Sequence, residues 1–131
     1  MRGFVILPWV WNKMNKIYIP IRADIDNEDS DDGYFSLGFV FNYDDNIIPH
    51  NIGLCRDELE GEPNSIYIEA DDQIYGFRTK KAKYSISDNI LTLTILDENV
   101  FYWDKSKIVN IKIDENKIDE IEKCLKSIFN I

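Results

Sequence analysis

The sequence predicts an α+β fold, with an antiparallel sheet of about six to seven strands and a C-terminal helix packed on one face. Three observations predict this class. Apolar and polar residues alternate in several short runs, which is the pattern of strands with one buried face. Polar turns at 71–73 and 88–89 separate three of these runs, and Asp and Asn at the second turn tolerate the positive φ angles of a two-residue hairpin. From residue 114 onward the apolar residues instead recur at helical spacing.

Two strands are expected in the first third of the chain. Residues 17–25 alternate cleanly, and Pro20 indicates either that this strand lies at a sheet edge or that this position faces solvent, since proline has no amide hydrogen to donate. Residues 34–41 place four large apolar side chains on a common face. Gly38 lies on the opposite face, where it indicates close backbone approach or a bulge.

The middle of the chain combines its least regular stretch with its clearest strands. Glycines and prolines interrupt residues 42–64, so we expect only a brief strand at 52–54 and one helical turn at 57–60 there. Residues 64–96 then predict three strands joined by the two turns. The residues expected on their apolar faces are Ile66, Ile68, Ala70, Ala82, Tyr84, Ile86, Leu91, Leu93 and Ile95.

The last third is expected to complete the sheet and cover it. Residues 97–106 form a short crossover, and we predict that its aromatic cluster is a lid on the core. Residues 107–113 alternate as the last strand. Asp114 is a suitable N-cap, because its carboxylate can accept the free amides of the first helical turn. The apolar stripe expected against the sheet is Ile118, Ile121, Leu125, Ile128 and Phe129.

The length of 131 residues and the hydrophobic content of 44% fit one domain with one core, residues 1–131. The apolar run at 4–11 is short and has no small-residue cleavage site after it, so it is interpreted as a short strand or an apolar arm and not as a signal peptide. Met14 is an alternative start, in which case residues 1–13 are an N-terminal extension. No apolar run approaches the roughly 20 residues that span a bilayer. Cys55 and Cys124 fit no disulfide framework or metal-ligand spacing, so we expect a cytoplasmic protein.

The charge balance is strongly acidic, with 24 acidic residues against 15 basic ones and a net charge of −9. Such a surface repels phosphate backbones and anionic membranes, so neither nucleic acid nor a membrane is expected as a partner. Solubility is the ordinary explanation of this charge, and complementarity to a basic protein is the sharper one. The densest acidic run is an expected loop at 26–32 that includes Asp29, Asp31 and Asp32, a second candidate contact for a basic partner.

The carboxylates Glu69, Asp71 and Asp72 form the only compact acidic group that directly follows a predicted strand. Glu69 and Asp71 would project from one face of a strand and Asp72 from the other. Such groups bind hard metal ions, perform acid–base chemistry, cap polar turns or form recognition surfaces. No phosphate loop, GxSxG, HExxH or CxxC accompanies them, and His50 is the only histidine. We therefore expect no catalytic residue, metal or cofactor.

Residues 66–76, IYIEADDQIYG, resemble the YxExDDQxxG signature of the immunity protein ten family of bacterial polymorphic-toxin systems. The stretches 34–39 and 54–56 and the pattern of the final strands and helix are similar to that family too. The resemblance covers roughly residues 17–129. Residues 77–81 depart from it, because they are basic and aromatic where small residues are expected.

The resemblance implies a cytosolic antidote that binds a toxin domain encoded beside it and neutralises that toxin by stoichiometric occlusion, without turnover. The toxin is expected to be basic, and the oligomeric state is left open. Two other classes stay open: a small carboxylate- or metal-dependent enzyme, and an adaptor domain that docks through a sheet edge. The expected contact residues are Glu69, Asp71, Asp72 and Gln73, with Tyr67 and Tyr75 as aromatic anchors.

Overall fold

The computed structural model describes residues 16–27, 34–44, 46–57 and 65–129. In these residues nine strands form two sheets, and a 3-10 helix and an α-helix follow them. The five-stranded sheet is antiparallel throughout and contains, in spatial order, β2 (Arg22–Asp26), β3 (Tyr34–Val40), β4 (Asn51–Asp57), β5 (Ile66–Ala70) and β6 (Asp72–Thr79). The four-stranded sheet contains β1 (Ile17–Tyr18), β9 (Ile108–Lys112), β8 (Ile90–Ile95) and β7 (Ala82–Ser87), and only its β1–β9 pair is parallel. The helices are η2 (Glu115–Lys117) and α2 (Ile118–Phe129).

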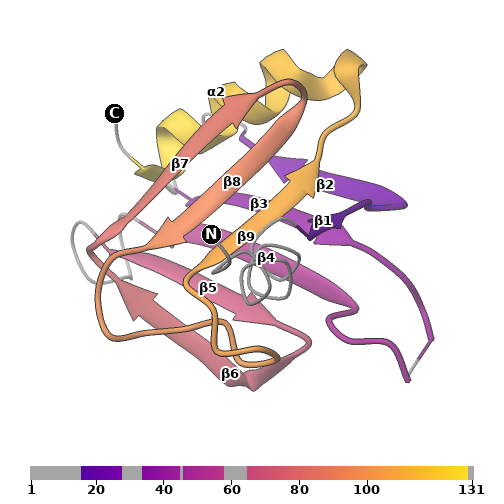
Figure 1. Cartoon of the computed structure of the whole chain (residues 1–131). Helices are drawn as coiled ribbons and strands as arrows, with labels where there is room; N and C mark the ends of the chain where they lie inside the picture. Colours follow the sequence, from indigo (N-terminus) through magenta and orange to yellow (C-terminus); the bar gives the residue numbers. More distant parts are fainter. Residues whose placement is uncertain (1–15, 28–33, 45, 58–64, 130–131) are drawn as a thin grey trace, which may run out of the picture.

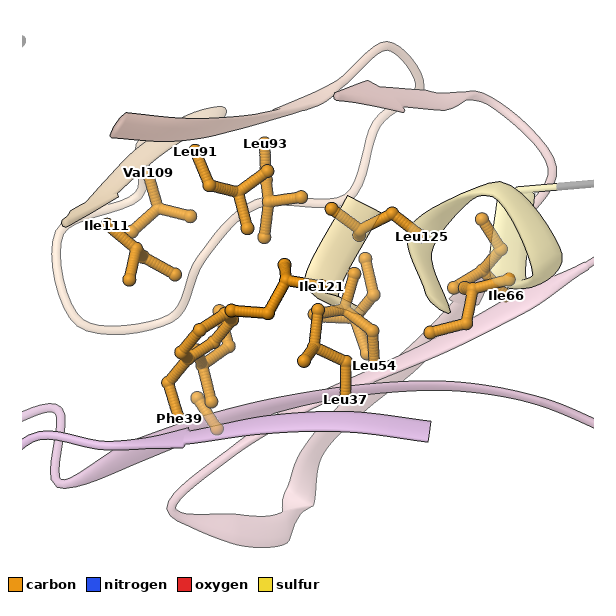
Figure 2. Packing of buried hydrophobic residues seen from close by; sticks show 14 of the residues in the cluster. Leu37, Phe39, Leu54, Ile66, Leu91, Leu93, Val109, Ile111, Ile121 and Leu125 are labelled. Carbon is orange, nitrogen blue, oxygen red and sulfur yellow. The ribbon is translucent and has the colours of Figure 1, made fainter. Parts of the chain in front are cut away.

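The two sheets face each other, and α2 lies along one end of them, where it packs on β2, β3 and β4 (Figure 1). Figure 2 shows Ile121 and Leu125 of α2 between side chains of the four-stranded sheet, such as Leu91, and side chains of the five-stranded sheet, such as Leu37. The α+β class and the C-terminal helix packed on a sheet are therefore confirmed. The expectation of one sheet of six to seven strands is wrong, because the strands divide into two sheets.

The first predicted strand, 17–25, is split between the two sheets. β1 pairs with β9 in one sheet and β2 pairs with β3 in the other, and the chain crosses between them around Pro20. Proline cannot donate a ladder hydrogen bond, so it is a suitable residue for this crossing. The isoleucines of the crossing do not join a buried face, since Ile19 is 71% exposed and Ile21 is 60% exposed.

Two further differences concern the five-stranded sheet. β4 runs from Asn51 to Asp57 and not only over 52–54, so Asp57 ends a strand and does not begin a helical turn; residues 58–60 lie outside the described part. β6 is a strand of eight residues that the alternation did not predict. Its exposure pattern explains the miss, because Asp72–Tyr75 are all exposed and show no apolar face.

The remaining strands and the helix follow the sequence pattern. The turn at 88–89 has the positive φ values expected of it, 54° at Asp88 and 64° at Asn89. Asp114 caps η2 by accepting the amide of Asn116 at 2.9 Å, and α2 continues from η2. Ile121, Leu125 and Ile128 are buried as predicted, with Cys124 beside them, and Ile118 and Phe129 pack at the edge of the core.

The crossover at 97–106 covers the core as predicted. Phe101 is buried and lies 5.3 Å from Trp103 between ring centroids. The Trp103 indole donates to the Tyr18 hydroxyl at 3.0 Å, which ties the crossover to β1. Arg56, whose side chain is buried, donates to the Ile128 carbonyl at 3.1 Å and so satisfies an acceptor near the end of α2.

Candidate functional site

The tight β5–β6 connection carries the acidic group that the sequence analysis selected. Ala70 pairs directly with Asp72, so Asp71 alone makes the turn, with φ at 66°. Aspartate is one of the few residues with a side chain that tolerates this left-handed conformation. The register shifts between Ile68 and Ala70, which marks a bulge beside the turn. The predicted acidic turn is thus confirmed, and it is shorter than expected.

The Asp71 carboxylate is bound within the chain. Its Oδ1 accepts the backbone amides of His50 at 2.6 Å and Asn51 at 3.1 Å, while its own amide donates to Asn51 Oδ1 at 3.2 Å. Its Oδ2 accepts the Tyr102 hydroxyl. Burial, and next this hydrogen bond, raise the pKa of Tyr102. Asp71 therefore joins three segments: the turn, the start of β4 and the crossover.

The side chains that neighbour Asp71 in the hairpin are exposed at the surface: Asp72, Gln73 and Tyr75. Asp72 Oδ1 accepts the amide of Ile74 at 3.2 Å, so its side chain also caps the local backbone. Gln73 is exposed, and Ile74 is 77% exposed. Tyr75 is 39% exposed and stacks on Tyr102 with ring centroids 3.7 Å apart and planes 4° apart.

Tyr67 and Glu69 form a separate unit on the outer face of β5. The Tyr67 hydroxyl donates to Glu69 Oε1 at 2.8 Å, and this hydrogen bond is the main reason that the pKa of Tyr67 is raised. The ring lies where a Cβ at position 76 would stand, so Gly76 leaves space for it. Arg78 places its guanidinium carbon 5.5 Å from the centroid of the same ring.

The structure therefore divides the predicted contact residues into two groups. Tyr67 and Glu69 share the outer face of the five-stranded sheet, while Asp71 points its carboxylate to β4 and the crossover. The expected pairing of Glu69 with Asp71 on one strand face is wrong, because the bulge and the positive φ of Asp71 interrupt the strand between them. Asp29, Asp31 and Asp32 lie outside the described residues.

A groove that the sequence analysis missed lies beside Glu69 on the outer face. Direct cross-strand pairing lines up Asp24, Gly38, Gly53 and Glu69 in one row across β2, β3, β4 and β5. These four residues line both of two adjoining hollows, of about 310 and 220 Å³. The other outer-face side chains that line them are Tyr34, Ser36, Val40, Asn51, Cys55 and Tyr67.

Both glycines of this row can be read from the sequence, but only Gly38 stands in a long predicted strand. Its interpretation as a site of close backbone approach or a bulge is wrong. Gly38 pairs with Gly53 in unbroken register, and a Cβ at either position would meet only one carbonyl oxygen, at 3.9 Å. The signal that would have found the groove is a glycine at the outward position of each of two paired strands.

Two other hollows involve different chemistry. A cleft of about 560 Å³ opens between Ile19–Ala23 and the end of β9, and aliphatic and charged side chains both line it. A hollow of about 300 Å³ lies between the β6–β7 turn and Asp97, where Arg78, Lys80 and Lys81 stand near carboxylates. Burial tends to raise the pKa of Asp97, but its hydrogen bonds to Thr79 and Asn99 outweigh this and lower it.

Neither hollow contains the acidic group of the β5–β6 hairpin. Among the described residues, no group of three or more His, Cys, Asp or Glu side chains could hold a metal ion. The helices in the same part of the chain include none that is long and apolar enough to cross a membrane. In comparisons with known proteins, the chain matches no protein-family model, no curated protein and no solved structure.

Proposed function

We propose that this protein is an antidote of the immunity type, which binds a cognate toxin domain and neutralises it by stoichiometric occlusion. The toxin is a basic protein, the antidote acts in the cytoplasm, and no cofactor takes part. The resemblance of residues 66–76 to the immunity protein ten family supports this class. The net charge of −9 supports an electrostatically steered encounter with a basic partner.

One observation carries the proposal: the β5–β6 hairpin presents acidic and aromatic side chains at the surface. Asp71 fastens the hairpin to β4 and to Tyr102, so the neighbouring side chains need little ordering when a partner binds. Asp72, Gln73 and Tyr75 are exposed beside this joint, and Ile74 adds an apolar contact between them. Such preorganisation is what a tight protein–protein contact requires, because it lowers the entropic cost of association.

The proposed contact surface extends from the hairpin to the outer face of β5. Glu69 and Tyr67 lie on that face, and tyrosine is a residue type that often carries much of the binding energy in interfaces. Occlusion of this kind requires no reacting group on the antidote. It requires a surface large enough to cover the substrate-binding region of the toxin, about 800 Å² per partner in a standard interface.

The test is co-purification with the product of the gene adjacent to the one that encodes this chain. We expect a complex of 1:1 stoichiometry by calorimetry, an affinity that falls as salt is raised, and loss of toxicity when both proteins are produced together. The double variant Glu69→Gln, Asp72→Asn should weaken binding at least tenfold. The double variant Asp119→Asn, Glu120→Gln is a matched control, since it removes two exposed carboxylates of α2.

Other results would favour the classes that stay open. Binding without any loss of toxicity would favour an adaptor domain, in which exposed Ile74 on the edge strand β6 is the docking residue. A chain that neutralises its neighbour at far below equal stoichiometry would contradict occlusion and favour an enzyme. Equal weakening by the α2 control would show that net charge alone, and not the hairpin, drives binding.

A further inference from the structure

The groove on the outer face of the five-stranded sheet has a specific construction. Its floor is the pair Gly38 and Gly53, which lie directly opposite each other in β3 and β4. Its two ends along the row are the carboxylates of Asp24 on β2 and Glu69 on β5. Three strand spacings of about 4.8 Å separate β2 from β5, so the two acidic ends stand about 14 Å apart at the backbone.

The fold itself does not require glycine at either floor position. A Cβ at position 38 or 53 would meet a single carbonyl oxygen at 3.9 Å, which is ordinary contact, and neither glycine has a positive φ. Glycine in a strand interior weakens the strand, because it has no side chain to pack and loses more backbone freedom on folding. Two glycines opposite each other therefore reduce the stability of the sheet, and they leave its outer face concave at this point.

The walls of the groove suit a guanidinium group. Glu69 uses Oε1 for the Tyr67 hydroxyl, and among the described residues Oε2 has no partner, so it can accept from an incoming donor. Two residues around the groove already contact guanidinium groups of this chain. Asp24 forms an exposed ion pair with Arg22 at 3.2 Å, and the Tyr67 ring lies under Arg78. Arginine combines a planar stacking surface with a fork of donors, and lysine has neither.

We propose that this groove accepts one arginine side chain of a partner protein, with Glu69 binding the guanidinium and the Gly38–Gly53 floor leaving room for it, while Asp24 stays paired with Arg22 at the far end of the row. The inference rests on the proposed function, since the partner that presents the arginine is the basic toxin. The two hollows of the groove have volumes of about 310 and 220 Å³, so each is at or below the low end of small-molecule sites and suits one side chain. The carboxylate of Glu69, which accepts only the Tyr67 hydroxyl among the described residues, favours a cation.

The test is an NMR titration of the whole ¹⁵N-labelled chain with the blocked tripeptide acetyl-Gly-Arg-Gly-amide. We expect saturable shifts of the Gly38, Gly53 and Glu69 amides, and none with the citrulline tripeptide, which has the same shape without the charge. The lysine tripeptide should bind at least threefold more weakly. Gly53→Val fills the floor where a Cβ has space, so it should weaken binding at least tenfold while the melting temperature is kept or raised.

Control variants separate this site from general charge. Glu69→Gln can still accept the Tyr67 hydroxyl, so it should weaken tripeptide binding without unfolding the chain, whereas Glu120→Gln on α2 should have no effect. Shifts that scatter without saturating, equal binding of lysine, or unchanged binding by Gly53→Val would each overturn the inference. A toxin that binds Gly53→Val as tightly as the wild type would also overturn it and would leave the antidote function standing. A chain that binds the tripeptide at the groove but protects against no toxin would instead contradict the proposed function.

Discussion

Replacing Asp71 should show how strongly one side chain of the acidic turn holds the fold. Asp71→Ala removes three accepted hydrogen bonds, from His50, Asn51 and Tyr102. Hydrogen bonds to charged groups contribute about 1.5–3 kcal/mol each, and the half-buried position and access of water reduce this to about 1 kcal/mol here. Alanine at a φ of 66° costs about 1 kcal/mol more. The expected loss is therefore about 4 kcal/mol.

A loss of this size is easy to measure. For a chain of this length 1 kcal/mol corresponds to about 3–5 °C in melting temperature, so Asp71→Ala should melt roughly 12–20 °C below the wild type. Asparagine tolerates the same φ and keeps one acceptor oxygen, so Asp71→Asn should lose only about 1–2 kcal/mol of the free energy of unfolding. Asp72→Asn is the control, with a loss below about 1 kcal/mol, because Asp72 is exposed and holds only the Ile74 amide. The reasoning is refuted if urea unfolding gives equal stabilities for the alanine variant and the wild type.

Three further predictions concern particular side chains. Gly76→Ala should displace the Tyr67 ring and break its hydrogen bond to Glu69, so the pKa of Tyr67 should fall toward 10.0, as absorbance at 295 nm would show; an unchanged titration would contradict the packing. The pKa of Tyr102 is raised, so above pH 10.0 its hydroxyl proton is lost more readily in the unfolded chain than in the folded one, and stability falls as pH rises. Tyr102→Phe should make this fall less steep in urea unfolding measured over a series of pH values. The pKa of Asp97 is lowered, so its contribution to the free energy of unfolding is present above pH 3.8 and is lost as the pH falls further. Between pH 5 and pH 3, Asp97→Asn should therefore lose less stability than the wild type. An equal loss in the two proteins would contradict the lowered pKa.

Local features of the fold could be predicted from the sequence because they depend on neighbouring residues. The 88–89 hairpin follows from residues that tolerate positive φ, and the Asp114 cap follows from a carboxylate at the start of a helical pattern. The buried faces of β5 and β8 follow from strict alternation, and both carry apolar side chains on the core side. These patterns depend on sequence separations of a few residues.

The division into two sheets could not be predicted in the same way. Alternation runs without a break through residues 17–25, yet the chain passes from one sheet to the other at Pro20. Which strand pairs with which depends on contacts between distant residues, such as β1 with β9. β6 was missed for another reason: its first four residues are exposed, so no apolar period was present to detect.

The same distinction explains why the acidic group could be found in the sequence while its roles could not. Asp71 and Asp72 are adjacent and carry the same side chain, but Asp71 accepts three hydrogen bonds from distant segments and Asp72 accepts one from its own turn. A motif that contains both therefore mixes a requirement of the fold with a candidate for recognition. The Gly38–Gly53 pair presents the opposite case, because the fold leaves space for side chains that the sequence does not supply. Glycines that lower stability and that the fold does not require are stronger evidence for a binding surface than a carboxylate that holds the fold together. The groove beside Glu69 is therefore a better candidate than Asp71 for the proposed contact with a partner.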